Sequence, residues 1–207
     1  MPVANAWEEA YARRGRLWGG QPDALPELAP SSSVLELGCG NGKNIPAMLH
    51  RGWQICALDI SRTALALART NTLPHHSIAW VRGDACTLPF CANVFDAVFA
   101  SHIFGHFHRK ARDTAAFEAW RVLKTGGRLF FRGFETSDMR CGEGSGVEDQ
   151  TYLRAGGTIT HYFTEEELYS LFHHFIPEQV RTRTWKMRIR GIDRVRAVVE
   201  GTFLRMD

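Results

Sequence analysis

The chain has 207 residues, of which 44% are hydrophobic and 23% are charged, a composition that suits one well-packed domain. Its formal net charge of +3 at pH 7 is too small to indicate a general preference for acidic partners. The five cysteines form no C-x-x-C pair, which argues against a zinc site or a disulfide framework and favours reduced thiols in the cytoplasm.

The first 30 residues are expected to form an arm ahead of the main domain. They lack the apolar run of a secretory leader, and no later segment has the apolar length of a membrane span. Asn5–Arg14 has helical character, with Trp7 and Tyr11 on one face, and a turn-rich segment containing Trp18 follows. Two interpretations stay open: the aromatic residues only pack the arm against the domain, or the arm is a flap over a ligand.

A glycine-rich turn between a strand and a helix is the most informative stretch of the chain. Val34–Leu37 is apolar around Glu36 and predicts a short buried strand, which Gly38, Gly40 and Gly42 follow. Glycine at alternate positions permits unusual backbone conformations and removes side chains that would block a ligand. The N–H groups at the start of the next helix favour a negatively charged group. This plan is typical of nucleotide binding.

The spacing of the glycines distinguishes between nucleotide-binding motifs. The dinucleotide fingerprint requires a glycine where Lys43 stands, and a P-loop requires serine or threonine where Asn44 stands. The pattern is E-x-G-x-G-x-G instead. The remaining alternative is a glycine-rich turn that binds nothing.

Strands and helices alternate after this turn, which predicts a parallel sheet with helices on both faces. The expected elements are a helix at Ile45–Arg51, strand Gln54–Asp59, helix Ser61–Thr70 capped by Ser61, strand His75–Arg82, strand Phe95–Ser101, helix Arg109–Leu123 and a strand at Leu129–Phe131. Ligands bind beyond the carboxyl ends of such strands. Asp59 ends one strand, where its carboxylate can accept two hydrogen bonds from ribose hydroxyls or merely cap a helix.

The ordered elements from residue 34 to residue 131 resemble the class I S-adenosylmethionine (SAM)-dependent methyltransferases. The glycine turn resembles their motif I, Gly83–Ala85 their G-D-A element, and Phe95–Val98 their F-D-x-V strand. Lys124–Gly127 resembles the L-K-P-G-G turn, with Thr125 in place of proline. The resemblance implies an α/β, Rossmann-like domain at residues 31–207, with a seven-stranded, mostly parallel sheet of order 3-2-1-4-5-7-6 and the last strand antiparallel.

The same resemblance implies that SAM is the cofactor and S-adenosylhomocysteine the product. It places Glu36 and the glycine turn at the methionyl end, Asp59 on the ribose, Asp84 and Ala85 at the adenine, and Ser101 near the sulfur. The full set expected to bind the cofactor is Trp18, Glu36, Gly38, Cys39, Gly40, Asn41, Gly42, Asp59, Ile60, Ser61, Asp84, Ala85, Cys86 and Ser101.

The acceptor side is expected beyond Gly133, where a polar, glycine-rich loop at about 135–157 occupies the place of acceptor-binding insertions in similar enzymes. Histidines cluster after the fourth strand, but without carboxylates at matching spacing no metal is expected. A neutral histidine can accept a proton near pH 7, or it can simply pack. The residues expected around the acceptor are His102, His106, His161, Tyr162 and Arg140, the last suited to a carboxylate or phosphate.

The tail, Gln179–Leu204, predicts two final strands in which basic and apolar residues alternate. Its arginines are compatible with a nucleic-acid surface, but the alternation favours the solvated side of an antiparallel hairpin. Upstream, Thr164 and Glu167 predict a capping box at the start of a helix.

Together these observations predict a SAM-dependent methyltransferase that transfers a methyl group to a small-molecule acceptor by in-line displacement. Nucleic acid is not expected as a partner, no membrane is involved, and the protein is expected to be a cytoplasmic monomer or homodimer. Two alternatives stay open. One is a methyltransferase acting on RNA or protein through the basic C-terminal strands, and the other is a SAM-binding module without catalysis.

Overall fold

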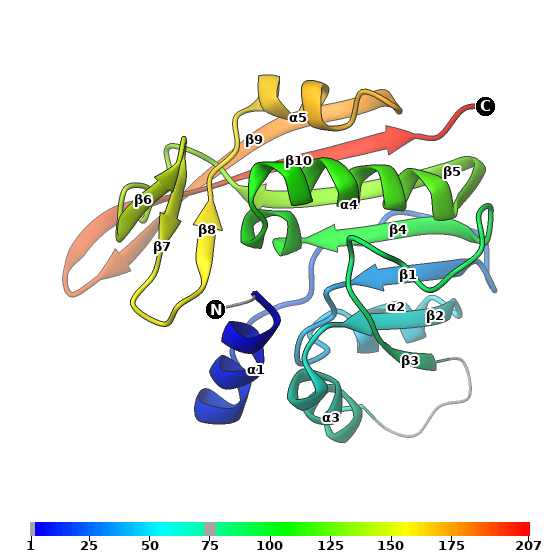
Figure 1. Ribbon diagram of the computed structural model, residues 1–207, viewed down its shortest axis with the longest axis horizontal. Coiled ribbons are helices and arrows are strands. Elements are labelled where there is room, and N and C mark those ends of the chain that lie inside the picture. Colours follow the sequence, from blue (N-terminus) through cyan, green and yellow to red (C-terminus); the bar gives the residue numbers. More distant parts are fainter. Residues whose placement is uncertain (1–2, 73–77) are drawn as a thin grey trace.

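A seven-stranded sheet forms the centre of the computed structural model, which describes residues 3–72 and 78–207. The strand order is β3-β2-β1-β4-β5-β10-β9, and β10 alone runs in the direction opposite to the other six strands (Figure 1). The strands are β1 (Ser33–Leu37), β2 (Gln54–Asp59), β3 (Ile78–Arg82), β4 (Phe95–Ser101), β5 (Leu123–Phe134), β9 (Ile176–Ile189) and β10 (Ile192–Leu204). The expected Rossmann-like fold and strand order are confirmed.

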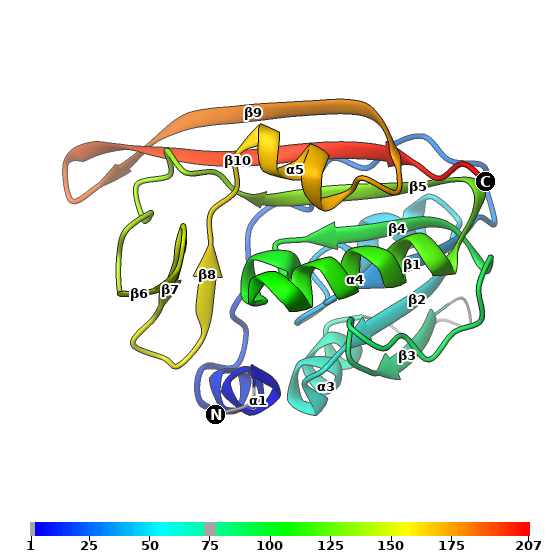
Figure 2. The ribbon, with the colours of Figure 1, turned by 45° about the horizontal axis from the view of Figure 1, so that its top comes forward.

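Helices cover the two faces of this sheet unequally. One face carries α4 (Arg109–Val122) and α5 (Glu165–Leu171), which lie in front of the sheet in Figure 2. The other face carries α2 (Ile45–His50) and α3 (Arg62–Thr70). Successive residues of β1 point into opposite cores, because Val34 packs on the α2 side and Leu35 on the α4 side. No helix in the described residues is long and apolar enough to cross a membrane.

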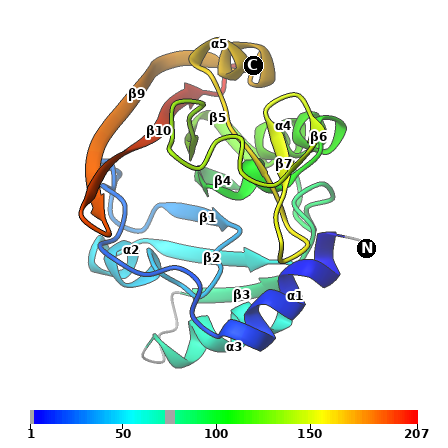
Figure 3. The same ribbon diagram turned by 90° about the vertical axis from the view of Figure 1, so that its left-hand side faces the viewer.

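The α2 side of the sheet stays open over β10 and β9. In the described part of the chain, no helix packs on this half of that face, and Figure 3 shows the β9–β10 hairpin curving along the outside of the molecule. Every residue of β9 from Arg181 to Ile189 is exposed. The hairpin turns through Arg190 (φ 49°) and Gly191 (φ 80°), the backbone signature of a tight two-residue turn. The basic tail is therefore a long, solvent-facing edge of the sheet.

A second, small sheet occupies the region expected to be a polar loop. Its strands are β6 (Ser145–Glu148), β7 (Thr151–Leu153) and β8 (Ile159–His161), paired antiparallel in the order β6-β7-β8. Within the acceptor-side loop expected at about 135–157, the structure thus places two short strands, β6 and β7, after a stretch of turns. Strands of three and four residues are too short to display alternation in the sequence.

The ends of two helices test the predicted caps. The hydroxyl of Ser61 accepts a hydrogen bond from the Ala64 N–H at 3.0 Å, as expected for an N-cap. Thr164 likewise accepts from the Glu167 N–H at 3.2 Å. The Glu167 carboxylate, however, contacts the ring of His161 with both oxygens at 2.9 Å, so only half of the predicted capping box forms.

The expected helix limits agree with the structure to within two residues, including α1 (Val3–Arg14) at the N-terminus. The third strand, expected from His75, is observed from Ile78, and its predicted first residues, 75–77, lie outside the described residues.

Trp53 provides a test of the core on the α2 side. Its side chain is fully buried and stacks on Phe99 with ring centroids 5.6 Å apart. Replacing it with alanine leaves a cavity, and we expect Trp53→Ala to lower the free energy of unfolding by about 3–5 kcal/mol in urea titrations. Tyr169→Ala, at a position 49% exposed, should change it by less than about 0.5 kcal/mol. Equal effects of the two substitutions would contradict this assignment of the core.

Candidate cofactor and acceptor site

A cavity of about 610 Å³, open to solvent, lies at the carboxyl ends of β1, β2, β3 and β4. Half of the residues expected to bind the cofactor line it: Trp18, Gly38, Asp59, Ile60, Asp84, Ala85 and Ser101. The other expected residues do not line it: Glu36, Cys39, Gly40, Asn41, Gly42, Ser61 and Cys86. The ends of four strands thus bring these residues together in one site.

The glycine turn needs glycine for its conformation and for the space around it. Gly38, Gly40 and Gly42 have φ angles of 71°, 54° and 80°, which L side chains rarely adopt. A Cβ atom on Gly40 would lie 2.5 Å from the hydroxyl of Tyr11, and one on Gly38 would lie 2.7 Å from Ile103 Cδ1. The turn therefore allows close approach by any group that enters the cavity.

Asp59 ties this turn to the start of α3. Its carboxylate, 7% exposed, accepts hydrogen bonds from the backbone N–H of Gly40 at 2.8 Å and of Ser61 at 2.9 Å. Burial raises the pKa of this carboxyl group above its usual range, although the backbone hydrogen bonds partly oppose the shift. A carboxylate held in this way at the end of β2 fits the expected contact with ribose hydroxyls, which stays a prediction.

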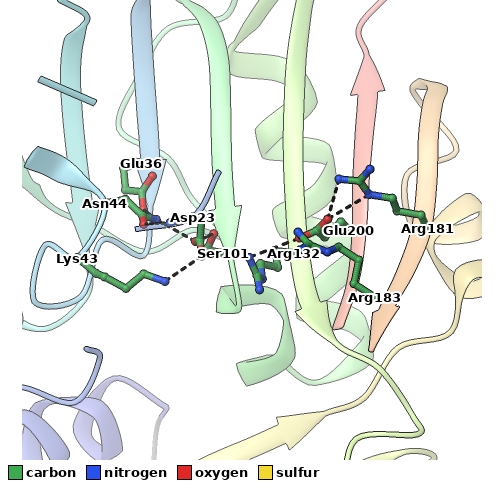
Figure 4. Close-up of polar contacts among 9 residues, drawn as sticks. All are labelled: Asp23, Glu36, Lys43, Asn44, Ser101, Arg132, Arg181, Arg183 and Glu200. Carbon is green, nitrogen blue, oxygen red and sulfur yellow. Dashed lines mark hydrogen bonds and ion pairs between the residues drawn. The ribbon is translucent and has the colours of Figure 1, made fainter. Parts of the chain in front are cut away.

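Glu36 is a buried carboxyl group with an unused oxygen (Figure 4). Its Oε1 accepts a hydrogen bond from Asn44 at 3.0 Å, whereas Oε2 has no partner among the described residues. Burial raises the pKa of Glu36 to about 8. A buried carboxyl oxygen without a donor fits an ammonium group, which is the chemistry of the methionyl end of SAM.

The N-terminal arm is fastened across the glycine turn. The backbone N–H of Trp18 donates to the Asn41 side-chain oxygen at 2.9 Å, and the Asn41 amide donates back to the Trp18 carbonyl at 2.8 Å. Five residues further on, Asp23 accepts hydrogen bonds from Lys43 at 2.9 Å, Ser101 at 2.8 Å and Arg132 at 3.2 Å (Figure 4). Burial alone would raise the pKa of Asp23, but these donors outweigh burial and hold it below its usual range.

Helix α1 closes the cavity from the opposite side. Its Glu8 accepts hydrogen bonds from the hydroxyls of Ser61 at 2.8 Å and Thr63 at 2.6 Å, at the start of α3. Trp7 and Tyr11 line the cavity together with four further residues that the sequence analysis missed: Leu58, Gly83, Ile103 and Phe107. The only sequence signal for this contact was the aromatic face of the N-terminal helix.

Two histidines expected near the acceptor line the same cavity. His102 has a left-handed backbone (φ 62°), and its ring lies parallel to Trp18 (centroids 5.7 Å apart, planes 5°) and against Phe134 (4.3 Å). Burial lowers the pKa of His102, and the positive charge of Arg132 lowers it further. It is therefore neutral at pH 7.

His106 lies one turn further on, within the short 3₁₀ helix η1 (Ile103–His106). Its Nδ1 lies 2.8 Å from the Ile159 carbonyl, so that nitrogen carries the proton. Nε2 is buried without a partner among the described residues and is left as an acceptor. Burial lowers the pKa of His106 to about 4, which keeps the ring neutral at pH 7.

The other three residues expected at the acceptor lie outside this cavity. His161 faces a different cavity, where its ring contacts Glu167 and, at 2.7 Å, the hydroxyl of Thr151. Tyr162 is fully buried and donates to the Arg140 carbonyl at 2.8 Å. Tyr162 and His161 therefore hold the small sheet in place, and only Arg140 remains near the acceptor side, through Phe134.

A row of stacked rings and guanidinium groups runs outward from His102; we call it the acceptor strip. It consists of Phe134, Arg140, Arg196 and Trp185. The guanidinium of Arg140 lies 4.4 Å from the centre of the Phe134 ring, and that of Arg196 lies 5.5 Å from the same ring and 5.7 Å from Trp185. Trp185, 40% exposed, ends the strip on the hairpin.

Asp138 orients both arginines of the acceptor strip. Its buried carboxylate accepts a hydrogen bond from Arg196 Nε at 2.6 Å and also pairs with Arg140 at 3.4 Å. Burial would raise the pKa of Asp138, but the hydrogen bonds from Arg196 and from backbone N–H groups lower it below its usual range. The arginines are thus held by a permanently ionised partner.

The basic residues of the hairpin divide between two faces. Ser101, Arg132, Glu200 and Arg181 are register partners across β4, β5, β10 and β9, so their side chains share the α2 side of the sheet (Figure 4). By the same alternation Arg183, Trp185 and Arg196 lie on this side. Lys186 and Arg188 lie on the opposite side. Among the described residues, no group of His, Cys, Asp and Glu side chains could hold a metal ion.

Comparison with known proteins agrees with this geometry. Residues 35–131 match the family model described as a methyltransferase domain. The chain carries a SAM-dependent methyltransferase domain. The methyltransferase also shares its fold with a SAM-dependent methyltransferase from Methanosarcina mazei, at a TM-score of 0.70 and 22% identity over 87% of this chain and 95% of that one.

Curated relatives extend the likeness beyond the shared core. The human tRNA N(3)-cytidine methyltransferase METTL2B is 28% identical over 163 residues, which cover 72% of this chain and 43% of that protein. A demethylmenaquinone methyltransferase from Corynebacterium efficiens is 32% identical over 121 residues, which cover 58% of this chain and 50% of that protein. The chain spans about half the length of these relatives.

The relatives correct one expectation from the sequence. We expected a small-molecule acceptor and no nucleic-acid partner, because alternating basic and apolar residues favoured a merely solvated hairpin. Several tRNA N(3)-cytidine methyltransferases match between 70% and 80% of this chain, and that finding overturns the expectation. Alternation establishes which residues share a face but says nothing of what the face binds.

The raised pKa of Glu36 predicts how stability depends on pH. In the folded state this carboxyl group keeps its proton up to about pH 8, whereas in the unfolded chain it loses the proton near its ordinary value of 4.5. The unfolded state therefore becomes more favourable as pH rises through this window. We expect Glu36→Gln to remove this dependence and to be more stable than the unmodified protein at pH 8, by at most about 5 kcal/mol.

Urea unfolding of both proteins at pH 5 and pH 8 measures this difference. Glu9→Gln, at an exposed position of α1, is the control and should follow the unmodified protein at both values. A Glu36→Gln variant that is less stable at pH 8 would show that the carboxylate is ionised and paired in the folded protein.

Proposed function

We propose that this methyltransferase transfers the methyl group of SAM to a base in RNA, and that its acceptor belongs to the tRNA class for which several relatives are named. The observation that carries the proposal is the acceptor strip. It joins His102, in the wall of the cofactor cavity, to Trp185 on the basic hairpin through consecutive ring and guanidinium contacts. RNA bases stack on aromatic rings and arginine planes in this way when they leave a helix.

The proposed mechanism requires alignment more than proton transfer. When bound, SAM would supply an activated methyl group for in-line attack by a nucleophilic ring nitrogen, with S-adenosylhomocysteine as the leaving group. Cytosine N3, the atom named for the relatives, has a free lone pair, so no general base has to remove a proton. The neutral rings of His102 and Trp18 exclude water from the approach, and His106 Nε2 offers an acceptor for a base amino group.

The N-terminal arm belongs to this proposal as a cover for the cofactor. Helix α1 and Trp18 bring three aromatic side chains to the cavity: Trp7, Tyr11 and Trp18. Glu8 clamps the helix to α3, and Asn41 clamps the segment after it to the glycine turn. We assign residues 1–30 as the flap and residues 31–207 as the methyltransferase domain.

The proposal is tested by direct product analysis. The protein is incubated with SAM and unmodified tRNA transcripts, and nucleosides from the digested RNA are separated and weighed by mass spectrometry. We expect a methylated cytidine that is absent without protein. Calorimetric titration with SAM, with NAD and Asp59→Ala as controls, establishes that the preparation binds its cofactor. SAM binding without any methylated nucleoside from a complete tRNA pool would overturn the RNA assignment.

Trp185→Ala tests the outer end of the acceptor strip. Stacking of one base on an aromatic ring contributes about 1–3 kcal/mol, so we expect the Kd for tRNA to rise about 5- to 150-fold while SAM affinity is unchanged. The matched control is Val195→Ala, which removes an equally exposed apolar side chain from the opposite face of the hairpin. Equal losses in the two variants would show that the strip does not contact RNA.

A further inference from the structure

A second cleft, of about 910 Å³, opens on the α2 side of the sheet. Its floor is formed by β5 and β10, one wall by residues 23–26 of the arm, and the other wall by the start of β9, with Gln179, Arg181 and Arg183. Ser101 lines both this cleft and the cofactor cavity. The two spaces therefore adjoin at the end of β4, on the same side of the sheet as the acceptor strip.

Charged side chains of alternating sign follow one line across this cleft (Figure 4). Asp23 pairs with Lys43 and Arg132, and Glu200 lies within 3.4 Å of Arg132. Arg181 and Arg183 complete the line on β9, where both pair with the same Glu200. Three of these cations, Arg132, Arg181 and Arg183, line the cleft together with the two carboxylates, which leaves a net charge of about +1 there when every group has its ordinary charge at pH 7.

Glu200 pairs with Arg181 and Arg183 but uses only some of their N–H donors. Its Oε2 accepts from Nε and Nη2 of Arg181 at 3.2 Å each, and its Oε1 accepts from Nη1 of Arg183 at 3.4 Å. A guanidinium has five N–H donors, so each arginine keeps donors for a further anion. Both side chains are about half exposed, at 53% and 54%, and the buried Nε of Arg132 has no partner among the described residues.

We propose that this cleft binds a phosphodiester group of the acceptor RNA, through Arg181 and Arg183 with Arg132 behind them. The proposal rests on the proposed function only for the source of the phosphate. Two forked guanidiniums on one face of a strand, about 7 Å apart, suit the bidentate geometry that phosphate oxygens accept. A purely structural set of surface ion pairs would not need the surplus positive charge or a cleft.

The position of the cleft explains how one RNA strand can meet both sites. Arg183 is followed on the same face of β9 by Trp185, the outer end of the acceptor strip. A strand whose target base enters the cofactor cavity can therefore stack a neighbouring base on Trp185 and place a phosphate at Arg181 and Arg183. The cleft positions the RNA backbone, whereas the strip contacts bases.

The first arm of the test measures tRNA binding against salt concentration. The variant R181Q/R183Q is compared with R188Q, which removes a positive charge from the opposite face of the same strand, where Arg188 pairs only loosely with Asp193 at 3.6 Å. We expect R181Q/R183Q to raise the Kd about tenfold and to reduce the slope of log K against log salt by about 1. R188Q should change the Kd less than about twofold.

Glu200→Gln separates a phosphate site from a structural ion-pair cluster. Removing the carboxylate leaves the arginines with uncompensated charge, so an anion site should bind tRNA several-fold more tightly. A structural cluster would instead lose both stability and binding. Unchanged SAM affinity in each variant establishes that the fold is intact.

A second arm uses inorganic pyrophosphate as the probe, followed by calorimetry, and needs no RNA activity. We expect the unmodified protein and R188Q to bind pyrophosphate and R181Q/R183Q not to. If tRNA is methylated but R181Q/R183Q and R188Q share one Kd and one salt slope, the phosphate site is wrong and the proposed function stands. If pyrophosphate binding depends on the two arginines but no RNA binds, the anion site stands and the RNA assignment falls.

Discussion

One partly buried carboxylate, Asp23, connects the parts of the chain that form the site. It receives hydrogen bonds from Lys43 in the glycine turn, from Ser101 at the end of β4 and from Arg132 in β5, a contact that spans 109 positions of sequence. A carboxylate with this little exposure to solvent stays ionised because several donors surround it. Those donors come from separate elements, so the arm, the cofactor turn and the acceptor side cannot move independently without leaving it unpaired.

This constraint also divides the open space of the molecule. The arm crosses the sheet where Asp23 is held, and the cofactor cavity lies on one side of it and the arginine-lined cleft on the other. Ser101 borders both spaces. Arg132, which pairs with Asp23, also forms an ion pair with Glu200 in the cleft. A ligand in one space thus lies next to side chains that shape the other, a physical route by which occupation of the two can be linked.

Local patterns in the sequence predicted the fold well, but they could not predict contacts between residues far apart in the sequence. The glycine spacing, the acids at strand ends and the alternation of strands and helices predicted a parallel sheet with helices on both faces, because each depends on residues close in sequence. The family that these motifs resemble then implied the strand order and seven of the residues that line the cavity. Asp23 gave no signal, since its importance comes from partners 20 to 109 positions away. The short strands β6, β7 and β8 were likewise not predicted, and neither was the position of His161 outside the cofactor cavity, where it contacts Thr151 and Glu167.

The basic hairpin shows why a correct local pattern led to a wrong functional conclusion. Its alternation was interpreted as a solvated hairpin, and β9 is indeed exposed, but exposure on the α2 side also places Arg183 and Trp185 beside the acceptor site. The arginines of that face pair with two carboxylates, Asp138 and Glu200, which differ in their exposure to solvent. Asp138 is fully buried and fixes Arg196 against two rings, where stacking needs a rigid plane. Glu200 keeps partial access to solvent and shares its oxygens among three guanidiniums, so these retain donors that a phosphate can use. The difference in burial of the two carboxylates separates a surface suited to bases from one suited to the backbone of the same strand.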